Sequence, residues 1–166
     1  MDFVKGAILA DRRNFIYAAN FKGIDLRYAR ATGAFFVKAQ MPGADLRNAE
    51  LTGADFRKSN LSRSDLRGVG VVLEGVDLRG ANLREADLTN ASFGPTVVKY
   101  ADFRSAKGLT EAVRYACSDY VLAFFDPDML KQLGLPPDHN EKLQQQMKAE
   151  QQTKAAATAP PSKVKP

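Results

Sequence analysis

The sequence has few of the side chains that most active sites use. Its 166 residues include one cysteine, Cys117, one histidine, His139, and no tryptophan. A single cysteine excludes a disulfide within the chain, and neither residue has sequence neighbours that form a metal-binding or nucleophile–base pattern. A Gly-rich phosphate loop is also missing. We therefore expect no catalytic residue, no metal site, no cofactor and no enzymatic activity.

Long hydrophobic runs are missing as well. No apolar stretch is long enough to span a bilayer, and the first twenty residues carry Asp2, Asp11, Arg12 and Arg13 instead of a continuous hydrophobic region. A lone cysteine fits a reducing compartment. The sequence therefore predicts a cytoplasmic protein without a membrane partner.

What the sequence does contain is a pattern five residues long: a small residue, a polar residue, Leu or Phe, and two more polar positions, as in residues 44–48 and 54–58. A helix needs apolar residues three and four apart, and a half-buried strand needs sustained alternation. Each unit must therefore be a short extended piece followed by a corner, and neighbouring units must stack to bury their apolar residues. The predicted core ladder consists of Phe21, Leu26, Phe36, Met41, Leu46, Leu51, Phe56, Leu61, Leu66, Leu78, Leu83, Leu88, Phe93 and Phe103.

The pattern resembles the signature of the pentapeptide-repeat proteins, Ala-(Asp or Asn)-(Leu or Phe)-x-x, over roughly residues 16–109. The resemblance implies an all-β repeat solenoid, a right-handed quadrilateral β-helix of about four coils, with four pentapeptides in each coil. Residues twenty apart would then stack on one face, with a slip of two residues near Val71.

This stacking predicts polar ladders on the outside of the rod. Asp25, Asp45, Asp65 and Asp87 would form one column beside Arg27, Arg47 and Arg67, as an ion-pair network worth little per pair. Amide side chains can hydrogen-bond along a ladder without charge repulsion. The predicted amide ladder consists of Asn20, Gln40, Asn60 and Asn82.

Phe35 and Val37 break the polar rule, because both would point outward on a third face. One interpretation is a contact surface for a partner. The other, which we favour, is that the N-terminal segment Met1–Tyr17 folds back and covers them.

The five-residue pattern stops near Leu109, and something must cover the end of the stack. Residues 110–134 are predicted to be a helical cap, with one helix after Thr110 and a second that begins at Asp126 and Pro127 and ends at Gly134. Residues 1–15 would form an N-terminal cap segment. Residues 135–166 would be a partly helical to disordered tail. The family resemblance also implies a homodimer through the C-terminal block.

The sequence thus favours a non-catalytic scaffold whose partner is another protein. The candidate protein contacts are Phe35, Val37, Tyr120, Leu122, Phe124, Phe125, Met129, Leu130 and Leu133.

Two alternatives stay open. The resemblance includes proteins that protect DNA gyrase by imitating duplex DNA, but a mimic needs uncompensated negative charge, and 24 Lys and Arg against 19 Asp and Glu give this chain a net charge of +5. The positive balance raises weak nucleic-acid binding instead, although neighbouring carboxylates and the lack of an aromatic platform disfavour it. The candidate basic face consists of Arg57, Arg79, Lys99, Arg84 and Arg104.

Overall fold

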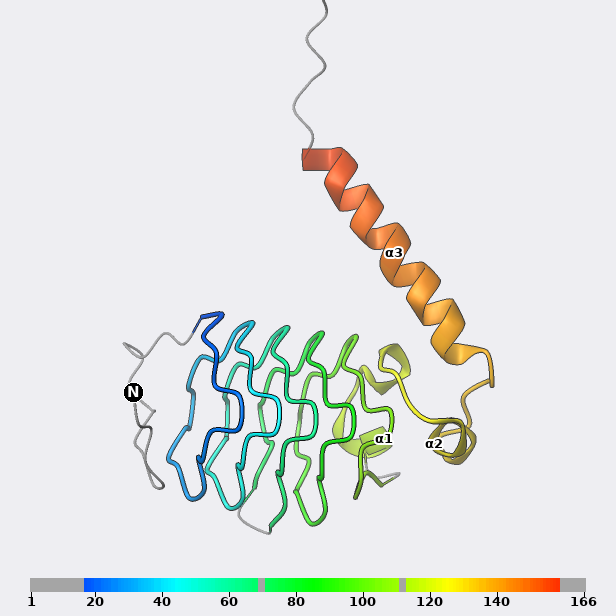
Figure 1. The fold of residues 1–166 in the computed structure, drawn as a ribbon. Coiled ribbons are helices and arrows are strands. Elements are labelled where there is room, and N and C mark those ends of the chain that lie inside the picture. The colour runs from blue at the N-terminus through cyan, green and yellow to red at the C-terminus, as the bar shows by residue number, and fades with distance from the viewer. Residues whose placement is uncertain (1–16, 69–70, 111–112, 159–166) are drawn as a thin grey trace, which may run out of the picture.

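The computed structural model describes residues 17–68, 71–110 and 113–158. Its first part is a stack of short coils, coloured blue to green in Figure 1. The described residues contain no continuous strand, because the chain turns a corner after each contact; isolated parallel bridges join the coils instead, such as Asn20 with Gln40 and Asp25 with Asp45. These bridges confirm the predicted stacking of residues twenty apart.

Each corner is a tight turn with a left-handed residue at its third position. At one such corner the Ala29 N–H donates to the Leu26 carbonyl at 3.0 Å, and the residue between them in the left-handed region is Tyr28, with φ of 59°. Gly43 holds the same position in another repeat, with φ of 69°. Only a turn that needs φ > 0 at this position explains why glycine recurs there. The non-glycine residues accept a backbone strain of about 1 kcal/mol each.

The inward positions of the repeats form the core. Every member of the predicted core ladder is buried except Phe21 and Phe93, which are partly buried and pack against the same cluster. Phe36 and Phe56 stack with their ring centroids 4.7 Å apart. The small residue of each repeat, such as Ala44, is also fully buried, which lets the coils approach closely.

The predicted slip of the repeat is confirmed by the bridges. Asp45 pairs with Asp65 and Asp77 pairs with Val97, both twenty residues apart, but Asp55 pairs with Asp77 across 22 residues. Two extra residues therefore enter the coil between positions 65 and 77. Residues 69–70 themselves lie outside the described part of the chain.

The C-terminal part begins with α1 (Val113–Ala116), the 3-10 helix η1 (Tyr120–Leu122) and α2 (Pro127–Gln132). In Figure 1, α1 and α2 lie at one end of the stack. The sequence predicted a helix through the spacing of Leu109, Val113, Ala116, Cys117 and Tyr120, but α1 has only four residues. The helix ends early because the chain must return to an extended path and pair with the last coil.

That extended path, residues 122–126, continues the stack as a partial coil. The Phe103 N–H donates to the Phe124 carbonyl at 2.9 Å, and Asp102 and Phe124 form a bridge 22 residues apart. Phe125 stacks on Phe103 with centroids 5.8 Å apart, so it occupies the next place in an inner column of the rod. Phe125 thus buries the open end of that column.

Two carboxylates complete the closure of this end. Asp119 accepts hydrogen bonds from the N–H groups of Val98 and Lys99 at 2.9 and 2.8 Å. Asp126 accepts the Ser105 N–H at 2.6 Å; it occupies the N-cap position of α2, as predicted, but makes no side-chain capping bond there. For Val98 and Ser105, these side-chain oxygens replace the carbonyls that a further coil would supply. For Lys99, Asp119 replaces the Asp two residues earlier that accepts the amides of Arg57 and Arg79.

The last element is α3 (His139–Thr158), a helix of twenty residues. In Figure 1 it starts near α2 and runs back beside the coils, and its far end projects beyond them. The sequence predicted a solvent-exposed, partly formed helix here, but His139 and Leu143 are buried. His139 Nε2 lies 2.9 Å from the Ala123 carbonyl, and the Asn140 side chain donates to the Phe125 carbonyl at 2.7 Å. The start of α3 is therefore anchored to the closing coil.

The predicted N-terminal cap segment, residues 1–15, and the last eight residues lie outside the described part of the chain. Within the described part, no helix combines the length and the hydropathy that crossing a bilayer requires.

Candidate functional site

The outer faces of the rod carry Asp–Arg pairs that come from the repeat itself. Asp45 accepts hydrogen bonds from Nε and Nη2 of Arg47 at 2.8 and 2.6 Å, and Arg47 also lies 3.5 Å from Asp65 of the next coil. The hydrogen bond from Arg47 holds the pKa of Asp45 below its usual range. The same pair recurs at Asp25 and Arg27, Asp55 and Arg57, Asp65 and Arg67, Asp77 and Arg79, and Asp102 and Arg104.

The predicted basic face is compensated by the same chemistry. Arg84 and Arg104 lie 3.5 and 2.6 Å from Asp102. Burial raises the pKa of Asp102, but the hydrogen bonds from the Arg104 side chain and backbone, together with the charges of Arg104 and Arg84, lower it by more, so the pKa falls. Arg57 and Arg79 hold Asp55 and Asp77, each at 2.6 Å, and Lys99 lies 3.7 Å from Glu150. Each of the five predicted cations therefore has a carboxylate partner.

Most of the predicted apolar contacts in the C-terminal block belong to the core of the chain. Phe124, Phe125, Leu130 and Leu133 are buried, because they close the end of the rod. Their burial corrects their assignment as exposed contacts. A homodimer through the rest of this block stays a prediction. Tyr120, Leu122 and Met129 are half-buried.

Phe35 and Val37 are both half-buried. The segment that was expected to cover them lies mainly in residues 1–16, outside the described part, so the choice between contact surface and covered patch stays a prediction. At the other end of the same column, Val97 is 42% exposed. The sequence did not single out Tyr115, which is 82% exposed, since its neighbours predicted only a packed helix.

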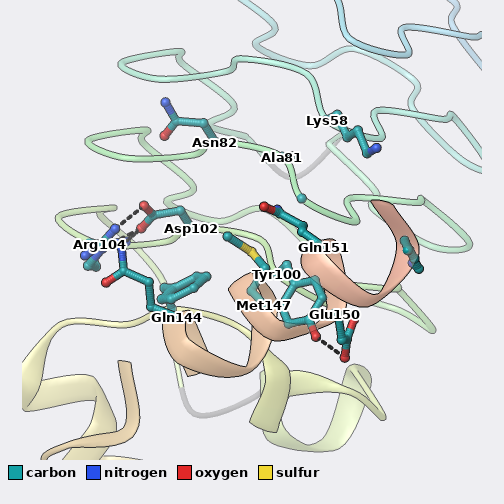
Figure 2. A pocket seen from close by; sticks show the side chains of 13 residues that line it. Lys58, Ala81, Asn82, Tyr100, Asp102, Arg104, Gln144, Met147, Glu150 and Gln151 are labelled. Atoms are coloured by element: carbon teal, nitrogen blue, oxygen red, sulfur yellow. Dashed lines mark hydrogen bonds and ion pairs between the residues drawn. The ribbon is translucent and has the colours of Figure 1, made fainter. Parts of the chain in front are cut away.

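A groove of about 610 Å³ lies between α3 and the coils. Figure 2 shows Met147 and Gln151 of α3 facing the coils that carry Asn82 and Asp102. Phe124 forms part of its floor, with the Arg104 guanidinium 5.3 Å from the ring centroid. The groove exists because α3 docks through its first turns and leaves room farther along.

One hydrogen bond crosses from α3 to the rod at the edge of this groove (Figure 2). The Tyr100 hydroxyl donates to Oε1 of Glu150 at 2.6 Å, and the Lys99 ammonium lies 4.8 Å from the Tyr100 ring centroid. Burial and then the Glu150 carboxylate raise the pKa of Tyr100 to about 12. The bond from Tyr100 lowers the pKa of Glu150. This contact joins charged and aromatic groups of the rod to a carboxylate of α3. The sequence pattern did not predict it.

The reactive side chains are used in packing. Burial, and then the negative charge of Asp119, raise the pKa of the Cys117 thiol to about 12, so this thiol is a poor nucleophile. Across the described ranges, no three His, Cys, Asp or Glu side chains gather in a way that could hold a metal ion.

Comparison with known proteins identifies the repeats. The family described as pentapeptide repeats matches in 8 copies, over residues 19–57, 38–68 and 69–94. No curated protein matches the chain.

Solved structures also resemble it. A trypsin-treated variant of QnrB1, a plasmid-mediated fluoroquinolone resistance protein, is 21% identical with a TM-score of 0.49, over 71% of this chain and 58% of QnrB1. HetL, a pentapeptide repeat protein involved in heterocyst differentiation regulation in the cyanobacterium Nostoc, is 21% identical with a TM-score of 0.37, over 63% of this chain and 54% of HetL. This chain therefore spans less than two thirds of either protein. Residues 19–94 of this chain therefore consist of pentapeptide repeats, the repeats that the sequence pattern predicted.

Proposed function

We propose that this chain is a non-catalytic scaffold that binds another protein on the outside of a rigid rod, a right-handed, four-sided β-helix of about four coils. The observation that carries the proposal is the filling of the interior. Inward residues such as Leu46, Leu61 and Phe56 are at most 1% exposed. Recognition therefore has to use the outer columns, whose spacing the bridges fix. We also take the compartment to be the cytoplasm, because a lone buried cysteine fits a reducing environment.

The ion pairs support this proposal over the two alternatives. A DNA mimic needs a run of unpaired negative charge, but Asp45, Asp65 and Asp77 each hold an arginine at 2.6 to 2.7 Å. Direct nucleic-acid binding needs free cations beside aromatic rings that can stack on bases. Tyr100 instead donates to Glu150 and carries Lys99 over its ring. A protein partner is the option that these contacts leave best supported.

The test compares capture by three immobilised proteins from lysate of the source cell at low and high salt. They are the native chain, a double variant with Phe35→Glu and Val37→Lys, and a control with Thr52→Glu and Thr89→Lys, which adds the same charges at exposed positions. Circular dichroism checks that all three are folded. We expect a protein that the native chain and the control retain at high salt and the first variant loses. Capture of nucleic acid alone, or of no protein at either salt concentration, would contradict the proposal.

A further inference from the structure

One column of the rod departs from the Asp–Arg rule at its last coil. Arg57 and Arg79 each hold the Asp two residues earlier in the chain, but the residue two before Lys99 is Val97. The missing carboxylate comes from α3, where Glu150 lies 3.7 Å from Lys99 and accepts the Tyr100 hydroxyl at 2.6 Å. Glu150 therefore occupies a place where the repeat leaves a cation without its own partner.

The surroundings of Glu150 are strongly basic. A shallow cleft of about 340 Å³ is lined by Arg57, Lys58, Arg79, Lys99 and Lys154, together with Glu150. Among residues 17–68, 71–110 and 113–158, the carboxylates within ion-pair distance of these five cations are Asp55, Asp77 and Glu150. The described residues place no carboxylate within ion-pair distance of Lys58 or Lys154, and both are exposed. Lys58 lines the same cleft as Tyr100 and Glu150. The cleft is therefore left with an excess of positive charge.

We propose that this basic cleft binds an acidic segment of a partner protein, and that Glu150 restrains binding by occupying part of the cleft in the free chain. The inference rests on the proposed function, since it names the chemistry of the partner. Carboxylates of the partner pair with Lys58, Lys99 and Lys154. When the acidic segment enters the cleft, one of its carboxylates replaces Glu150 as the ion-pair partner of Lys99.

The contacts favour an acidic peptide over a nucleic acid. The occupant that the structure shows in the cleft is itself a carboxylate, Glu150. The free cations are lysines, which lack the planar fork that pairs with phosphate in two places, and the two arginines already hold Asp55 and Asp77. The one aromatic ring, Tyr100, is covered by Lys99 and is not open for base stacking.

The position of Glu150 along α3 explains how it can yield. His139 and Leu143 anchor the first turns of the helix, while residues 151–158 are exposed. Glu150 thus provides the last contact before the helix extends into solvent. Loss of this contact leaves the anchored turns in place, so the helix does not have to unfold for the cleft to open.

The test measures binding of a fluorescein-labelled hexaglutamate peptide to the purified full chain by anisotropy at low salt. Glu150→Gln removes the internal carboxylate, and we expect binding to tighten about threefold or more, because one negative charge leaves the cleft. The double change Lys58→Ala with Lys154→Ala should weaken binding at least about fivefold. The matched control, Lys142→Ala with Lys148→Ala, removes the same charge from other positions of α3 and should change binding less than about twofold.

Three results would overturn the inference. Equal weakening by the control would mean that only net charge matters. Unchanged or weaker peptide binding by Glu150→Gln would mean that Glu150 does not restrain binding. Tighter binding of a single-stranded oligonucleotide of equal charge, dependent on Lys58 and Lys154, would assign the cleft to nucleic acid. The peptide assay needs no cellular partner and leaves Phe35 and Val37 unchanged, so its failure is separate from failure of the capture experiment.

Discussion

The repeat rod and the C-terminal segment are stabilised in different ways. In the rod, residues 17–109, the same contact recurs at each coil: an inward Leu or Phe, a buried small residue, a parallel bridge and an Asp–Arg pair. In the C-terminal segment, residues 113–158, each contact occurs once, as with Asn140 on the Phe125 backbone or Glu150 on Tyr100. The free-energy cost of losing one contact in the rod is therefore spread over the neighbouring coils. Losing one contact in the C-terminal segment instead removes a link that no other contact replaces.

The junction between the two regions combines both modes. Ala123, Phe124 and Phe125 repeat the small–outer–inner order of Ala101, Asp102 and Phe103, and the Asp102–Phe124 bridge puts them in register. The chain thus reuses the rod's pattern once more to seal the rod. Outside this short piece, the segment depends on individual side chains.

The largest expected effect distinguishes the middle of the rod from its end. Phe56→Ala should cost about 3–5 kcal/mol, because it empties a place between coils and removes the stacking on Phe36. Phe125→Ala removes a ring of the same size, which stacks on Phe103 at the end of the stack. Its loss should be confined to the C-terminal segment. Urea unfolding gives the total cost, and hydrogen exchange resolved by segment shows where protection is lost.

Tyr115→Ala is the control for this comparison, since the side chain is 82% exposed and should matter by less than about 0.5 kcal/mol. Loss of protection throughout the rod in Phe125→Ala would show that the two regions unfold as one unit.

A second pair of changes compares glycines with the same backbone angle. Gly43 and Gly108 have φ of 69° and 72°, but an added Cβ meets nothing within 4 Å at Gly43 and overlaps the backbone of Thr89 at Gly108. Gly43→Ala should therefore cost only left-handed strain, about 1 kcal/mol. Gly108→Ala should cost about 3 kcal/mol, since the backbones at the junction must separate. Equal losses in thermal or urea unfolding would rule out a steric role for Gly108.

The rod could be predicted from the sequence because each kind of contact in it recurs in many repeats. The inner ladder and the slip near Val71 follow from where Leu and Phe recur, and the register of twenty is what the resemblance to pentapeptide repeats implies. A local departure such as Gly94-Pro95, which interrupts the turn pattern beside Phe93, changes one corner without hiding the rest.

The positions of the closing coil and of the docked helix α3 could not be predicted from the sequence as accurately as that of the rod. Ala123-Phe124-Phe125 carried the repeat signal, but Phe124 stands where the pattern expects Asp or Asn, and fourteen residues separate it from Leu109, where the pattern stops. The docking of α3 was indicated even more weakly in the sequence. The one related feature is Val97, which stands in place of Asp and leaves Lys99 to pair with a distant residue. A pairing made once leaves no periodicity to detect.

Removal of a single carboxylate tests how the end of the rod is sealed. Asp119→Ala leaves the amides of Val98 and Lys99 without their acceptor and should cost about 2 kcal/mol, the range for a hydrogen bond to a charged group. These two amides should also exchange faster with solvent. Asp128→Ala, at an exposed position in α2, is the control and should cost at most about 0.5 kcal/mol. Unchanged exchange at Val98 and Lys99 would mean that the side chain does not replace the missing coil.

The smallest effect concerns the single bond between α3 and the rod at Tyr100. Burial and Glu150 raise the pKa of Tyr100 to about 12, so the bond should contribute fully below the ordinary tyrosine pKa of about 10 and be lost as the pH rises through 12. A spectroscopic titration of the native chain minus that of Tyr100→Phe isolates this hydroxyl among the five tyrosines. We expect a midpoint near pH 12 in the native chain and a lower one in Glu150→Gln, because the negative charge that disfavours the tyrosinate is gone. A native midpoint near pH 10 would mean that Glu150 does not hold Tyr100 in solution. The ion pair between Glu150 and Lys99 and the anchored first turns would then hold α3 against the rod without the Tyr100 bond.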